Sequence, residues 1–165
     1  MLDNLRRRRS RNYARRSAER AAGRLMRTAA AAGPVASVTD LVGTVEHEIG
    51  TPVTMIEMEL PCGQVGFTRL TDAEAVIAVS PRCTTWQHTV AHELGHLVLG
   101  HRHGGVEIAP PPPGGYAMWA ALQRELEREA AVNELEAEAF ATRVLEMLPR
   151  CGESRGHVRW KDALG

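Results

Sequence analysis

The sequence predicts an α+β fold in which a small antiparallel sheet packs with several helices. Segments 3–32 and 118–148 are long and repeat apolar residues at helical spacing, and segment 84–99 repeats them over a shorter run. Three short stretches between residues 52 and 79 are apolar or alternate between apolar and polar residues, which is typical of strands. At 165 residues, the chain has the length of one domain with attachments.

We divide the chain into an N-terminal arm at 1–34, a domain at 35–150 and a tail at 151–165. The formal net charge of the whole chain is zero, but the charges are unevenly distributed. Residues 1–27 hold ten arginines and only two acidic residues, so the rest of the chain is acidic. The sequence is therefore a basic arm attached to an acidic domain.

The arm is predicted to be a helix over 3–32, with arginine on most of its faces. One face is an apolar stripe at helical spacing, formed by Ala14, Ala18, Ala21, Ala22, Leu25, Met26 and Ala29. Three interpretations stay open. The stripe docks on the acidic domain, the arginines of 1–27 bind nucleic acid or another polyanion, or the arm is partly disordered and the chain starts at Met26.

After the arm, the elements are short. A glycine–proline pair ends the first helix, and a short amphipathic helix is predicted over 38–49. Strands are predicted at 52–60, in a segment that ends at Leu70 after a turn with two glycines, and at 75–79. Because the three strands are so close in sequence, we expect them to pair in order as an antiparallel meander.

Cysteine usage and hydropathy bear on the location of the protein. The three cysteines, Cys62, Cys83 and Cys151, are far apart and odd in number, which argues against a disulfide framework and for a reducing compartment. No apolar run reaches the roughly 18 residues of a membrane span. We therefore expect a cytoplasmic protein with no membrane partner.

The predicted helix at 84–99 carries the strongest chemical signal, a His-Glu-x-x-His pattern. His92 and His96 are four residues apart, so they lie on one face of the helix, where one metal ion can bind both imidazoles. The carboxylate of Glu93 can reach a water on that metal without being a ligand itself. We therefore predict His92 and His96 as metal ligands and Glu93 as the catalytic base. The alternative is a buried helix whose histidines bond to backbone carbonyls.

A third ligand must come from elsewhere in the chain, since a catalytic zinc needs three protein ligands and an open position. The helix at 118–148 offers Glu134 and Glu138, one turn apart. One carboxylate can bind the metal, and the other can hold a ligand histidine by its second nitrogen. An ordinary charged face is the alternative, because acidic residues are dense throughout 125–138.

These segments together resemble a known family. The stretches 89–96, 134–141 and 145–149 are similar to the His-Glu-x-x-His helix, the Glu-x-x-Ala-Asn/Asp-x-Phe-Ala helix and the Leu-Leu-Met-Pro-like close of the ImmA/IrrE family of small zinc metallopeptidases. The resemblance covers about residues 38–150. It implies a minimal zincin-like metallopeptidase domain that binds one Zn²⁺ per chain.

By this resemblance Glu134 is the third zinc ligand, and Glu138 supports a ligand histidine by bonding its second ring nitrogen. Glu138 departs from the family, which has Asn or Asp at that position. The oxyanion of the reaction needs a donor, and Tyr116, His101 and His103 in the long loop after the metal helix are candidates.

The function expected by resemblance is that of a zinc endopeptidase whose protein substrate is a helix-turn-helix transcriptional repressor. Two alternatives remain. The chain is a non-proteolytic metal-containing module that binds a repressor or nucleic acid through the basic arm, or it is an inactive structural zinc fold.

Overall fold

The computed structural model describes residues 2–101 and 116–149, and the side chains of 11–101 and 124–149. It confirms the α+β class. The elements are α1 (Leu2–Ala32), the 3₁₀ turn η1 (Val38–Leu41), α2 (Val42–Ile49), β1 (Val53–Glu57), β2 (Gly66–Leu70), β3 (Ala75–Val79), α3 (Trp86–Val98) and α4 (Tyr116–Met147). The predicted tail at 151–165 and most of the predicted loop lie outside the described residues.

The sheet corrects the predicted antiparallel meander. Its strand order is β1-β3-β2, with β3 parallel to β1 and antiparallel to β2. The last strand in sequence takes the central position because it is the most apolar, and four of its five residues are buried. By contrast, β2 buries only Thr68 and lies at the edge. Segment 58–65, between β1 and β2, is long enough to leave room for β3 between them.

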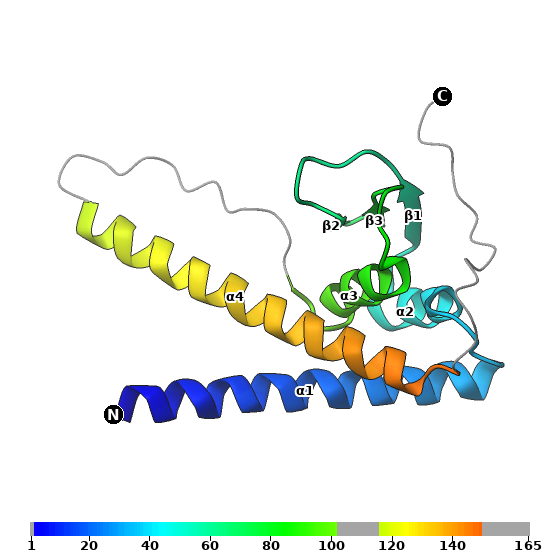
Figure 1. Ribbon diagram of the computed structural model, residues 1–165, viewed down its shortest axis with the longest axis horizontal. Coiled ribbons are helices and arrows are strands. Elements are labelled where there is room, and N and C mark those ends of the chain that lie inside the picture. Colours follow the sequence, from blue (N-terminus) through cyan, green and yellow to red (C-terminus); the bar gives the residue numbers. More distant parts are fainter. Residues whose placement is uncertain (1, 102–115, 150–165) are drawn as a thin grey trace.

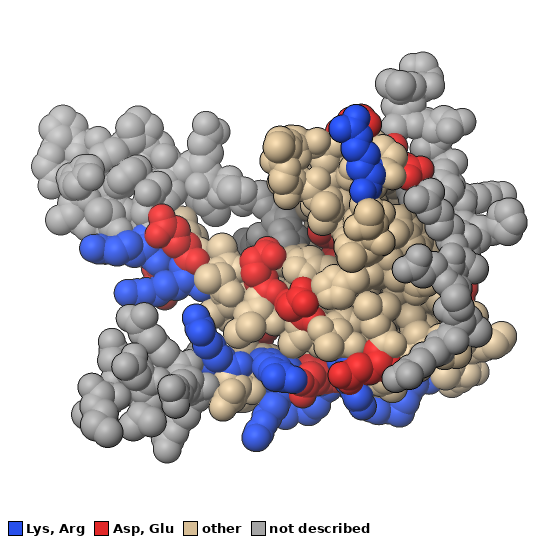
Figure 2. All heavy atoms as spheres, viewed as in Figure 1, with Lys and Arg blue, Asp and Glu red and all other residues tan. Residues whose placement is uncertain are grey.

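The stripe on α1 docks on the rest of the molecule, as one of the three interpretations predicts. Its members, Ala14, Ala18, Ala21, Ala22, Leu25, Met26 and Ala29, are all buried. The small alanine side chains let α1 pack along α4, and Figure 1 shows the two helices side by side. The arginines of residues 11–27 stay exposed, and Figure 2 shows basic side chains along the edge of the molecule that α1 forms.

One hydrophobic core joins the helices to the sheet. It includes buried residues of α1, α2, β1, β3, α3 and α4, so the arm shares its core with the predicted domain. In Figure 1 the sheet lies on one side of α3, and α4 and α1 lie on the other. The central helix α3 is therefore packed from both sides, and this packing positions the candidate site.

Candidate metal centre

Helix α3 is held rigidly because most of its surface is covered. Val90, Leu94 and Leu97 are buried in the core, and the chain beyond the helix turns at Gly100. On the side facing α4, Gly95 lets the ring of Phe140 approach closely: a Cβ at Gly95 would lie 2.9 Å from Phe140 Cδ1. This contact brings the backbone of α4 next to the two histidines.

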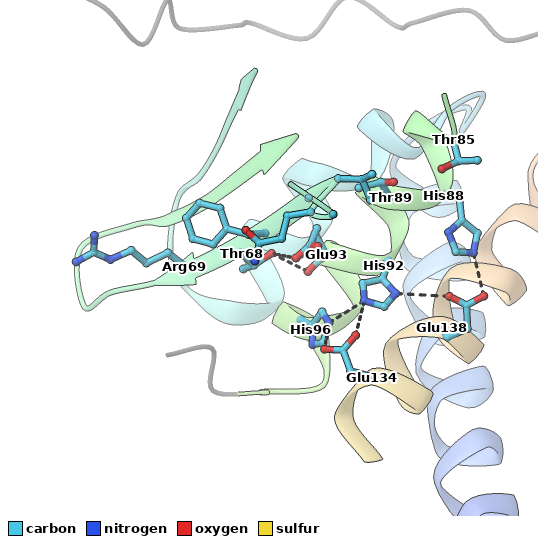
Figure 3. A pocket seen from close by; sticks show the side chains of 15 residues that line it. Thr68, Arg69, Thr85, His88, Thr89, His92, Glu93, His96, Glu134 and Glu138 are labelled. Atoms are coloured by element: carbon cyan, nitrogen blue, oxygen red, sulfur yellow. Dashed lines mark hydrogen bonds and ion pairs between the residues drawn. The ribbon is translucent and has the colours of Figure 1, made fainter. Parts of the chain in front are cut away.

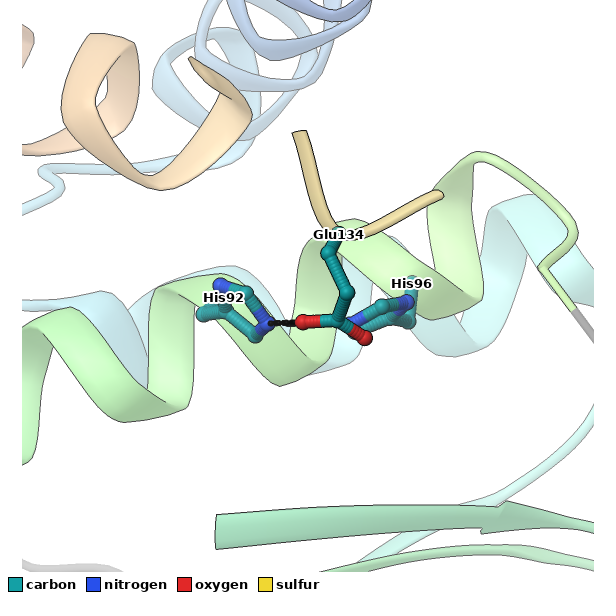
Figure 4. A group of neighbouring side chains, drawn as sticks. All are labelled: His92, His96 and Glu134. Carbon is teal, nitrogen blue, oxygen red and sulfur yellow. Dashed lines mark hydrogen bonds and ion pairs between the residues drawn. The ribbon is translucent and has the colours of Figure 1, made fainter. Parts of the chain in front are cut away.

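Three of the predicted residues converge at the meeting of α3 and α4 (Figure 4). The Nε2 atoms of His92 and His96 are 3.0 Å apart. Glu134 Oε2 lies 3.2 Å from His92 Nε2, and Glu134 Oε1 lies 3.6 Å from His96 Nε2. These ligand atoms could together hold a metal ion. The structure thus brings together the three residues predicted as ligands.

The three side chains differ in their freedom. His96 is 1% exposed and His92 is partly buried, so the protein fixes both rings. The side chain of Glu134 is 62% exposed, so its carboxylate borders solvent. Within the part of the chain that the structure describes, a metal at this point would be held by two fixed imidazoles and one adjustable carboxylate, with one side open to the cleft.

Glu93 lies on the sheet side of α3, buried against β2. Thr68 Oγ1 donates a hydrogen bond of 2.7 Å to Glu93 Oε2. Strand β2 approaches closely because residue 66 is glycine: a Cβ there would lie 2.5 Å from Thr89 Cγ2 and 3.0 Å from Glu93 Oε1. The carboxylate is thus oriented by a neutral donor, and no arginine pairs with it among the described residues.

The pKa of Glu93 is raised above its ordinary value. Burial is the largest cause, because it disfavours the charged carboxylate, and the negative charge of Glu134 adds to the rise. The hydrogen bond from Thr68 and the charge of His92 act in the opposite direction. A carboxylate whose pKa is raised toward neutrality is a better proton acceptor and donor than an ordinary one.

Glu138 lies one turn beyond Glu134, on the far side of His92. Its Oε2 is 3.7 Å from His92 Nδ1, an ion-pair distance that is long for a hydrogen bond. Its Oε1 is 3.2 Å from His88 Nε2. The predicted carboxylate therefore faces the second nitrogen of His92. Sequence reasoning missed His88, although it precedes His92 by four residues on the same face of α3.

The structure describes the three candidate oxyanion donors to different extents. His101 is buried behind His96, with its Nδ1 3.0 Å from His96 Nδ1 and its Nε2 3.0 Å from Glu136 Oε2. Both ring nitrogens are engaged on the side away from the ligand atoms, and His101 is not among the residues that line the cleft, so this geometry gives no support to its predicted oxyanion role. His103 lies outside the described residues, and only the backbone of Tyr116 is described, at the start of α4.

A cleft of about 750 Å³ opens onto these residues (Figure 3). One wall is the segment that leads into β2 and β2 itself, and the opposite wall is formed by α3 and α4. Its lining includes Thr68, Arg69, His88, His92, Glu93, His96, Glu134 and Glu138. The cleft thus places the candidate metal ligands and Glu93 beside an edge strand.

No family model, no curated protein and no solved structure matches the chain. Among the described residues, no helix combines the length and the apolar character needed to cross a membrane.

Proposed function

We propose that this chain is a zinc-dependent endopeptidase that cleaves a specific regulatory protein. One observation carries the proposal: two imidazole nitrogens and a carboxylate converge from different helices, beside a buried carboxylate in an open cleft. Structural zinc sites use all four positions for protein ligands, whereas catalytic sites leave one open. Three donors at the edge of a cleft fit the catalytic class.

The donor set and its spacing suit zinc. Zinc takes imidazole nitrogens and carboxylate oxygens at about 2.0–2.2 Å in tetrahedral sites, which places neighbouring ligand atoms about 3.3–3.6 Å apart. Of the three separations here, 3.6 Å lies in that range, and 3.0 and 3.2 Å lie just below it. When bound, zinc would supply Lewis acidity for the hydrolysis of a peptide bond.

The chain's own residues account for the proton transfers. Glu93 would take a proton from the attacking water and return it to the leaving amine, so that one carboxyl group serves both steps. Its raised pKa suits both roles, and the hydrogen bond from Thr68 fixes its orientation. His92 and His96 would hold the metal with Glu134, and Glu138 would steady His92 through its second nitrogen.

The edge position of β2 supports a polypeptide substrate. Within the described residues, β2 pairs only with β3, so its other edge can accept an extended chain. This edge borders the cleft that contains Glu93 and the candidate ligands. By the family resemblance, we propose that the substrate is a helix-turn-helix transcriptional repressor.

The test is co-expression with a repressor encoded next to this gene, comparing the natural chain with Glu93→Gln. We expect repressor fragments with the natural chain and none with Glu93→Gln. The matched control is Glu129→Gln, an exposed acid on α4, which should cleave as the natural chain does. Equal cleavage by the natural chain and Glu93→Gln would refute the assignment of Glu93.

The second candidate function is a non-proteolytic module that binds a repressor or nucleic acid through α1. It is favoured by a groove between α1 and the end of α4 whose lining holds six arginines and two acids. The acids, Glu19 and Glu146, pair with Arg15 and Arg143, and the other four arginines are Arg16, Arg20, Arg24 and Arg27. Removing α1 would not test it cleanly, since α1 is part of the core. Replacing Arg16, Arg20, Arg24 and Arg27 by Gln keeps the buried stripe. If repressor release survives Glu93→Gln but fails in this variant, the binding function replaces the enzymatic one.

A further inference from the structure

The end of α3 places a second histidine behind His96. Leu99 caps the helix, and Gly100 follows with φ +69°, in the left-handed region that favours glycine. The Gly100 N–H donates to the Leu97 carbonyl (3.1 Å) and the His101 N–H donates to the His96 carbonyl (3.0 Å). This pair of bonds is the Schellman motif, in which the residue after the glycine returns to the residue five positions earlier. The backbone turn therefore sets His101 against His96.

A chain of short contacts runs from His96 through His101 to α4. His96 Nδ1 lies 3.0 Å from His101 Nδ1, and His101 Nε2 lies 3.0 Å from Glu136 Oε2. The side chain of His101 is 5% exposed and that of Glu136 is 19% exposed, so water competes little for these contacts. Helix α4 thus reaches His96 twice, directly through Glu134 and indirectly through Glu136.

Hydrogen-bond chemistry decides which atoms donate and which accept along the contacts from His96 through His101 to Glu136. An ionised carboxylate only accepts hydrogen bonds, so Glu136 requires a proton on His101 Nε2. A neutral His101 then has a lone pair on Nδ1, and His96 must donate to it from its own Nδ1. In that tautomer the Nε2 of His96 carries a lone pair, and Nε2 is the atom that faces His92 and Glu134.

We propose that His101 and Glu136 are positioning residues that fix the ring and the tautomer of His96 for metal binding. The inference rests on the proposed metal site and adds residues that have no contact with the metal. In the alternative arrangement His101 donates from both ring nitrogens, to Glu136 and to Nδ1 of His96. The proton of His96 would then lie on Nε2, and Nε2 could not bind the metal. The proposal therefore predicts one tautomer and excludes the other.

The first experiment measures zinc affinity by competition with a chelator in the full chain. His101→Phe keeps a ring of similar size without hydrogen bonds, and we expect zinc affinity to fall about 10–100-fold. Glu136→Gln keeps an acceptor without the charge, so a smaller loss of about tenfold is expected. Glu129→Gln, which removes an exposed charge from the same helix, should leave the affinity unchanged.

The second experiment separates positioning from folding. Gly100→Ala and Gly50→Ala place a Cβ at positive φ, and in both cases no atom lies within 4 Å of it. Both should therefore lower the unfolding midpoint of the metal-free protein similarly. Only Gly100→Ala should also weaken zinc binding, because Gly50 ends α2 away from the site. This comparison remains informative if His101→Phe does not fold.

The third readout is the tautomer of His96 in the metal-free protein, from ¹⁵N NMR of the imidazole nitrogens, because a zinc-bound Nε2 carries no proton whatever orients the ring. A proton on Nδ1 of His96 supports the proposal, and a proton on Nε2 overturns it. Zinc affinity of His101→Phe within twofold of the natural chain also overturns it, while leaving the metal site intact. If the natural chain itself fails to bind zinc, the proposed function fails, and this inference fails with it.

Discussion

The two helices that meet at the candidate metal centre contribute in different ways. Helix α3 supplies two imidazoles and Glu93 from a buried helix, and His96 is 1% exposed. Helix α4 supplies carboxylates near the surface, and the side chains of Glu134 and Glu138 are 62% and 55% exposed. Packing in the core thus fixes the side chains of α3, whereas the position of the α4 carboxylates depends on how closely the two helices pack.

The largest expected effect concerns Glu93, the proposed proton-transfer group of α3. Glu93→Gln should reduce the rate of substrate cleavage by about 10²–10⁴-fold, because a general base is lost. Zinc stoichiometry should stay at that of the natural chain, since Glu93 is not among the ligand atoms. Metal analysis of the purified variant beside its cleavage rate checks both parts. Loss of zinc together with activity would make Glu93 a ligand and contradict its assigned role.

Removing Glu134, the proposed ligand on α4, should have the next largest effect. Glu134→Ala leaves two imidazoles, and zinc affinity should fall by more than the roughly 10–100-fold typical of losing a supporting residue. The unfolding midpoint of the metal-free protein should hardly change, because the side chain is mostly exposed. Chelator competition and thermal unfolding measure the two effects. Glu127→Ala, another exposed acid on α4, is the control, and an equal affinity in both variants would remove Glu134 from the site.

Spacing between the helices can be tested at their closest approach. Gly95→Ala would place a Cβ 2.9 Å from the buried ring of Phe140, so the helices must separate or the ring must shift. Overpacking of this kind costs about 1–3 kcal/mol in the free energy of unfolding. Zinc affinity should fall as well, because Glu134 moves with α4. Gly43→Ala meets no atom within 4 Å and is the matched control in denaturant unfolding.

Burial of Glu93 predicts a pH-dependent effect on stability in the metal-free protein. Because burial raises its pKa in the folded state, the folded protein holds this proton more tightly than the unfolded chain. The free energy of unfolding therefore falls as the pH rises from the ordinary pKa of Glu93 to its raised pKa in the folded protein, because the buried carboxylate becomes charged. Glu93→Gln should stabilise the metal-free protein more at pH 8 than at pH 5. An equal effect at both pH values would contradict the raised pKa.

The smallest expected effect concerns the outer surface of α4. Arg143 Nη1 lies 2.9 Å from Glu146 Oε2, but both side chains are well exposed. Exposed pairs of this kind contribute about 0–1 kcal/mol. Arg143→Ala should therefore change the free energy of unfolding by less than about 1 kcal/mol and leave zinc affinity unchanged. A larger loss in denaturant unfolding would show that the charged surface of α4 supports its packing.

Local spacing explains what could be predicted from the sequence. His92, Glu93 and His96 lie within one helix, so the helical repeat alone places them. The rings of His92 and His96 lie next to each other, as a spacing of four residues predicts. The stripe of α1 follows from the same repeat. The choice of Glu134 among many acids relied on the family resemblance, because no local rule says which carboxylate of α4 faces α3.

The strand order, which was predicted wrongly, and the contacts of His101, which were not predicted, both depend on contacts between distant segments. The meander assumed that neighbouring strands pair in order, but the buried strand β3 took the centre of the sheet. A run of five apolar residues at 75–79 was the available signal for a central strand. The contact of His101 with His96 was not predicted, although Gly100 marked a helix end that returns the next residue to His96. Its partner Glu136 lies 35 residues away, and no spacing rule reaches that far.

The most direct test of the metal centre is anomalous diffraction at the zinc edge from crystals grown with zinc. We predict one strong peak, with His92 Nε2, His96 Nε2 and a Glu134 oxygen within about 2.0–2.2 Å of it. A zinc peak bound by other residues, or the absence of a peak between α3 and α4 under saturating zinc, would contradict the account.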